Sequence, residues 1–156
     1  MEFASLIAEL GNRLHVRGDI EVDDENRCLM EFDGMGVVIQ GDDELRTLSL
    51  LAPLCDPPPE RLEELYRTLL EANHLFAGTF GATLSIDPGR GWVHLCKNLP
   101  YAALDAEVLA SELENFMNAV ERWSSEVKGF RAHEDSAEGG DRNAEEKPMD
   151  DAFLRV

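Results

Sequence analysis

The spacing of apolar residues along the chain predicts the order helix, three strands, helix, two strands, helix. Near the start, apolar positions recur every three or four residues, which is the period of one helix face. These positions are Phe3, Leu6, Ile7, Leu10 and Leu14. Gly11 costs this short helix roughly 1 kcal/mol relative to alanine, so packing against the rest of the domain must hold it.

The next segment follows the two-residue period of strands. The apolar runs are Cys28–Phe32, Val37–Ile39 and Leu45–Leu54, and polar turns at 33–34 and 41–43 separate them. Connections this short join antiparallel neighbours, so we expect a three-stranded meander. Alternate side chains must point to opposite faces, but the period does not say which face meets the core.

A second helix and a hairpin follow. Asp56-Pro57-Pro58-Pro59 ends the third strand, because proline cannot donate to a strand ladder, and proline suits the first turn of a helix. The apolar stripe of that helix is Leu62, Leu65, Leu69, Ala72 and Phe76, widened by Tyr66. Alternating apolar residues from Phe80 to Ile86, a turn at 87–89 and the run Trp92–Leu99 then predict the hairpin.

The last helix carries the strongest amphipathic pattern. We expect Asp105 to cap it and Gly129 to end it. Its apolar stripe is Leu109, Leu113, Phe116, Val120, Trp123 and Val127. Together these elements predict one α+β domain over residues 1–130, a twisted antiparallel sheet with helices packed on it.

The composition changes after that domain. Residues 131–156 are rich in Glu, Asp, Gly and Ala, so we predict an acidic, disordered tail. Its end, Ala152-Phe153-Leu154-Arg155-Val156, is a short apolar cluster. A frayed end and docking on the body or on a partner are both open, and the sequence does not assign the tail a role.

Charge narrows the choice of partners. The chain has 32 acidic and 14 basic residues, a formal net charge of −18, of which the tail carries only −4. An acidic body repels nucleic acid and anionic lipid and favours basic partners, although acidity also serves solubility alone. No apolar run approaches the length of about 18 residues that a membrane span needs. We therefore expect neither a nucleic acid partner nor membrane insertion.

The cysteines indicate a reducing compartment. Cys28, Cys55 and Cys96 are odd in number and lack CxxC spacing, and the chain does not open like a signal peptide. We therefore expect a cytoplasmic protein without a disulfide framework.

Candidate chemistry is sparse. His94 and Cys96 share one strand face, but no second pair completes a four-ligand metal site. The chain has no phosphate-binding glycine loop and no nucleophile elbow, and no pair of carboxylates stands out. We therefore predict no catalytic residue, no metal and no cofactor. Three amphipathic helices also offer more apolar surface than one sheet of ordinary width hides, which favours a binding protein.

The element order resembles class I type III secretion chaperones, the Tir-chaperone family. Three local features carry this resemblance. They are Asp24-Glu25-Asn26-Arg27 before the first strand, Ala72-Asn73-His74-Leu75-Phe76 at the end of the second helix, and Leu99-Pro100 before a long helix that ends near Trp123. The resemblance covers about residues 1–130 and leaves out the tail.

The resemblance implies a non-enzymatic homodimer that binds the N-terminal chaperone-binding segment of a secreted virulence effector. The effector would be held extended, soluble and competent for secretion. For the dimer interface we predict the second helix, through Leu62, Leu65, Tyr66 and Leu69. For effector binding we predict apolar patches at Leu6, Leu10, Leu14, Leu29 and Val38.

The alternative is an immunity protein or another stoichiometric inhibitor. Such proteins are also small, acidic and non-catalytic. An inhibitor would bind a folded, basic toxin domain instead of an extended segment.

Overall fold

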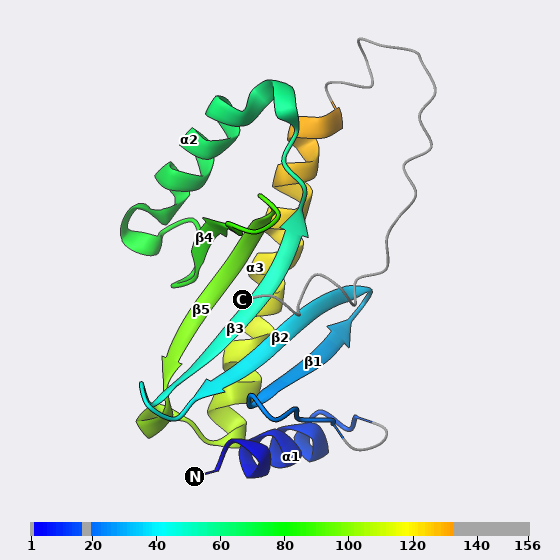
Figure 1. Ribbon diagram of the computed structural model, residues 1–156, viewed down its shortest axis with the longest axis vertical. Helices are drawn as coiled ribbons and strands as arrows, with labels where there is room; N and C mark the ends of the chain where they lie inside the picture. The colour runs from blue at the N-terminus through cyan, green and yellow to red at the C-terminus, as the bar shows by residue number, and fades with distance from the viewer. Residues whose placement is uncertain (1, 17–19, 133–156) are drawn as a thin grey trace.

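The computed structural model describes residues 2–16 and 20–132 (Figure 1). The helices are α1 (Phe3–Arg13), α2 (Leu62–Asn73) and α3 (Ala106–Ala132), with 3-10 turns η1 (Pro59–Arg61), η2 (His74–Phe76) and η3 (Tyr101–Ala103). The strands are β1 (Arg27–Phe32), β2 (Met35–Asp42), β3 (Thr47–Cys55), β4 (Thr83–Ile86) and β5 (Val93–Pro100). The predicted element order is confirmed. From residue 133 onward, the predicted tail lies outside the described residues.

The strands form one antiparallel sheet in the order β1-β2-β3-β5-β4. The predicted turn at 33–34 joins β1 to β2. The second turn lies at 43–46 and not at the predicted 41–43, because β2 continues through Asp42 and β3 begins only at Thr47. Strand β5 then inserts between β3 and β4. Helix α3 runs behind the sheet, α1 lies at one end of it, and α2 lies beyond the β4 edge (Figure 1). No helix of the described ranges lies over the front of β1, β2 and β3, so this part of the sheet has one open face (Figure 1).

The structure decides which strand residues meet the core. Cys28 and Ile39 are 3% and 0% exposed and pack in the cluster beneath α1 and α3. Their neighbours Leu29 and Val38 alternate to the open face and lie opposite each other in the β1–β2 register. The main members of the core cluster from the sheet are Cys28, Met30, Val37, Ile39, Leu48, Leu50, Ala52, Leu95 and Leu99.

The end of α2 differs from the prediction, which continued this helix to Phe76. The Asn73 side chain donates to the Leu84 carbonyl (3.0 Å) and accepts from the Leu84 N–H (2.9 Å). These two bonds tie the helix end to β4, so the chain leaves the helix at Asn73. The following segment contains Leu75, Phe76 and Phe80 at φ values of 54°, 56° and 53°, and β4 begins only at Thr83.

The two ends of α3 also test the prediction. Asp105 Oδ1 accepts from the Val108 N–H at 2.8 Å, as expected of a capping residue. Gly129 does not end the helix, which continues to Ala132. A cation–π contact with a residue outside the helix stabilises the last turn, because the Arg61 guanidinium lies 4.8 Å from the centroid of the Phe130 ring.

Leu10→Ala should lower the free energy of unfolding by about 2–5 kcal/mol, because Leu10 is 0% exposed and its removal leaves a cavity under α1. Chemical denaturation followed by circular dichroism measures this loss. Leu45→Ala is the matched control, because Leu45 is 73% exposed and should change stability by less than about 0.5 kcal/mol. Equal stability of both variants would contradict the core position of Leu10.

Candidate binding surfaces

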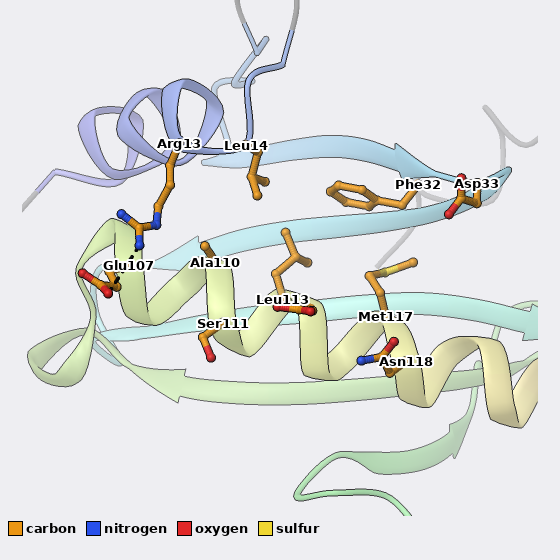
Figure 2. Close-up of a pocket in the computed structure, with 11 residues that line it drawn as sticks. Arg13, Leu14, Phe32, Asp33, Glu107, Ala110, Ser111, Leu113, Met117 and Asn118 are labelled. Atoms are coloured by element: carbon orange, nitrogen blue, oxygen red, sulfur yellow. Dashed lines mark ion pairs between the residues drawn. The ribbon is translucent and has the colours of Figure 1, made fainter.

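A groove of about 530 Å³ lies between α1, the end of β1 and α3. Its lining comes from three segments far apart in the sequence, as Figure 2 shows. The lining residues are Arg13, Leu14, Phe32, Asp33, Glu107, Ala110, Ser111, Leu113, Glu114, Met117 and Asn118. This volume falls within the range of about 300–1,000 Å³ that is typical of ligand pockets.

The floor of the groove is apolar. Leu113 and Met117 are buried in the core, and Leu14 and Phe32 are half-buried and packed against it. Their side chains project toward one another from α1, β1 and α3 in Figure 2. An apolar side chain of another segment that enters here loses its contact with water, which stabilises a complex by about 1.5–3 kcal/mol for each Leu- or Phe-sized group.

The rim of the groove is charged and mainly acidic. Arg13 of α1 and Glu107 of α3 form an ion pair at 3.3 Å across one end (Figure 2). Both side chains are substantially exposed, so this pair contributes at most about 1 kcal/mol to stability. Asp33 and Glu114 add two further carboxylates to the rim. The groove therefore favours an apolar segment with a basic flank.

A second apolar surface crosses the open face of the sheet. Leu29, Val38, Leu51 and Cys96 are successive cross-strand neighbours on β1, β2, β3 and β5. We call these four residues the open-face row. Leu29, on the edge strand, is 47% exposed, whereas Val38, on the next strand, is 6% exposed. The row begins at β1, which lies at the edge of the sheet and presents its outer side for strand addition.

A third apolar surface follows α2 and the segment that joins it to β4. Tyr66, Leu70, Leu75, Phe76 and Phe80, here called the α2 patch, are 36%, 71%, 82%, 51% and 62% exposed. The last three hold left-handed backbone, which is rare for bulky residues. Exposed apolar side chains on strained backbone are typical of an interaction surface.

The structure corrects two of the predicted effector-binding residues. Leu6 and Leu10 are 2% and 0% exposed, because the single apolar stripe of α1 is used to cover the core. Leu14, at the end of α1, lines the groove, and Leu29 and Val38 lie in the open-face row. The predicted residues therefore lie in three places: the core, the groove and the open-face row. Among them only Leu14 and Leu29 offer substantial contact area to a partner.

The residues predicted for the dimer interface are likewise divided between the core and the surface. Leu65 and Leu69 are 0% and 4% exposed and belong to the core, whereas Tyr66 lies in the α2 patch. Leu62 is half-buried. Sequence reasoning missed Leu70. This residue is apolar but lies beside the stripe of α2, and an apolar residue outside the stripe was the available signal of a second contact surface.

The titratable groups of the open face are poorly suited to chemistry. Burial raises the pKa of the Cys96 thiol and lowers the pKa of the His94 imidazole. Burial likewise raises the pKa of Cys28, on the core face, to about 12. Thiols with raised pKa values stay protonated at neutral pH, and a protonated thiol is a poor nucleophile and metal ligand. Among the described residues, no three His, Cys, Asp or Glu side chains are placed to hold a metal ion.

The described helices set one further limit. Across residues 2–16 and 20–132, no helix combines the length and the apolar character that crossing a membrane requires.

The fold is shared with chains of several solved protein complexes. A chain of the ExsC–ExsE complex has a TM-score of 0.68 at 23% identity, with 80% of this chain and 92% of that chain covered. A chain of the HopA1–SchA chaperone–effector complex has a TM-score of 0.64 at 19% identity, with 81% and 93% covered. A chain of the complex of the Yersinia pestis type III secretion chaperone SycH with a fragment of YscM2 has a TM-score of 0.62 at 17% identity, with 78% and 98% covered. At identities below 25% this likeness shows a shared fold and nothing more.

The family follows from the sequence itself. The profile of the Tir chaperone protein (CesT) family matches residues 5–124, which includes all five strands and α2. This chain belongs to that family, so the resemblance seen in its sequence is confirmed. No curated protein matches the sequence at a significant level.

Proposed function

We propose that this chain is a cytoplasmic chaperone that binds the N-terminal segment of a type III secreted effector and keeps it soluble and secretion-competent. The groove between α1, β1 and α3 carries the proposal, because its apolar floor and acidic rim fit an unfolded segment with a basic flank. The family supports it, as does the likeness to a chain of a chaperone–effector complex. Binding is stoichiometric and requires no catalytic step.

The geometry suggests how such a segment is held. An extended chain paired with the outer side of β1 sends alternate side chains to opposite faces of the sheet. One set enters the groove on the helix-covered face, and the other set packs on Leu29 of the open-face row. The segment is therefore gripped from both sides of one edge strand.

The energetics require this double contact. Ordering an extended segment costs about 1–2 kcal/mol for each residue. Each buried Leu- or Phe-sized side chain returns about 1.5–3 kcal/mol, so a single anchor in the groove cannot hold a segment of several residues. Anchors on both faces, added to main-chain hydrogen bonds along β1, are needed for a stable complex.

We further propose that the chain forms a homodimer through the α2 patch. The three most exposed of its members, Leu70, Leu75 and Phe80, have between 62% and 82% of their surface in water in the isolated chain. Two copies that bury these side chains against each other gain the stabilisation that a single copy lacks. The patch lies beyond the β4 edge, away from β1 and the groove, so dimerisation leaves both grooves accessible.

Copurification with the natural partner tests the proposed function against the inhibitor alternative. We expect a stoichiometric complex in which limited proteolysis leaves an N-terminal effector segment protected and the rest of the effector cleavable. The acidic groove and the edge strand suit a segment without tertiary structure, and binding requires its ordering. A protected, folded, basic toxin domain would instead assign the chain to the immunity proteins or related inhibitors.

A further inference from the structure

The chain carries a candidate occupant for its own groove. We propose that Ala152-Phe153-Leu154-Arg155-Val156, here called the tail motif, binds in the groove between α1, β1 and α3 and is displaced when an effector arrives. The displacement rests on the proposed function, whereas the contact between the tail motif and the groove can be tested without an effector.

The composition of the tail selects this motif. Between residues 131 and 151 the only large apolar side chain is that of Met149, whereas Phe153, Leu154 and Val156 follow within a few positions. The groove offers an apolar floor of matching character, to which Leu14 and Phe32 contribute half-buried side chains. A groove of about 530 Å³ holds a few side chains of this size.

Charge complementarity orients the motif and limits its affinity. Arg155 stands between two apolar residues of the motif, and the rim presents Asp33 and Glu114 to a cation. The rest of the tail is acidic, and so is the body that it must approach. Repulsion between the acidic linker and the acidic body therefore opposes binding of the tail, whereas attraction between Arg155 and the rim favours it. The resulting contact is weak enough for an effector to replace.

The linker has the length that this contact requires. From Leu113, in the middle of the groove, α3 continues to Ala132, which at a rise of 1.5 Å for each residue is a span of about 28 Å. The 19 residues 133–151 connect Ala132 to the motif. If they are disordered, as their composition predicts, a linker of that length has a root-mean-square end-to-end distance of about 25 Å. Effective concentration is highest, at about millimolar, when these two lengths agree. Even a weak motif then occupies the groove for a substantial fraction of the time.

The contact is tested in the full-length chain without any effector. The double variant Phe153→Asp with Leu154→Asp removes the motif, and methyl NMR reports on Met117 and Leu14 in the groove. We expect both methyl signals to shift relative to the unaltered chain. Asn143→Asp with Ala144→Asp adds the same charge to the linker and should leave the signals unchanged. Identical groove signals in the unaltered chain and the motif variant would overturn the proposal, and a shift that disappears on dilution would assign the motif to the groove of a second copy.

Effector affinity separates this inference from the proposed function. We expect the motif variant to bind the N-terminal effector segment about 2–10-fold more tightly than the unaltered chain, because a competitor has been removed. Equal affinities with unchanged methyl signals would remove the tail contact and leave the proposed function intact. Shifted methyl signals without effector binding in any variant would remove the proposed function and leave the contact between tail and groove.

Discussion

Leu14→Asp should weaken binding of the effector segment at least about 100-fold while the fold and the dimer persist. Leu14 is half-buried on the groove floor, so an aspartate there remains hydrated in the isolated chaperone. In the complex the carboxylate would lose its water among the apolar side chains of the groove floor, at a cost of several kcal/mol. Fluorescence anisotropy with a labelled effector segment measures this loss.

Val16→Asp is the matched control for this variant. Val16 follows α1 closely, is 40% exposed and does not line the groove. The Val16→Asp variant should bind the effector segment with the same affinity as the unaltered chain. Normal binding by Leu14→Asp would show that the effector uses another surface. Leu10→Asp cannot replace it as a probe, because Leu10 is 0% exposed and the charge would unfold the domain.

Leu70→Glu combined with Phe76→Glu should convert the homodimer into a monomer. Light scattering should give about twice 17.4 kDa for the unaltered chain and about 17.4 kDa for the variant. Both side chains are more than half exposed in the isolated chain, at 71% and 51%, so charges there leave the fold unchanged. In a dimer the same charges would face each other across an apolar contact and be desolvated without partners.

A change of equal size outside the α2 patch controls for the effect of added charge. Leu45, in the turn between β2 and β3, is 73% exposed, and Leu45→Glu should remain a dimer. Circular dichroism should show the same fold for all three proteins. A monomeric unaltered chain at micromolar concentration would contradict the dimer, and a dimeric double variant would move the interface away from the α2 patch.

Local signals were sufficient for the order of elements. The period of the apolar positions depends only on whether neighbouring residues follow a helix or a strand. The cap of α3 was predictable because the two partners of a capping hydrogen bond are only three residues apart in the sequence. Here the bond joins the Asp105 side chain and the Val108 N–H. The three prolines at 57–59 separate β3 from α2 for reasons that are equally local.

The faces of the elements were decided by packing. The stripe of α1 is apolar whether it covers the core or receives a partner, so the pattern could not place Leu6 and Leu10. The left-handed backbone of Leu75, Phe76 and Phe80 comes after a helix end that the Asn73 side chain ties to Leu84 of a later strand. That contact joins two elements, so the spacing of apolar residues within α2 could not predict it.

The sequence by itself determined the order of the elements, the turn between β1 and β2, the acidity of the body and the family. The tertiary structure alone decided where a partner can bind. The groove joins Leu14, Phe32 and Met117, which three separate elements bring together. Residues this far apart meet only when α1 and α3 pack on the same face of the sheet, and that packing depends on the shapes of all the side chains between them.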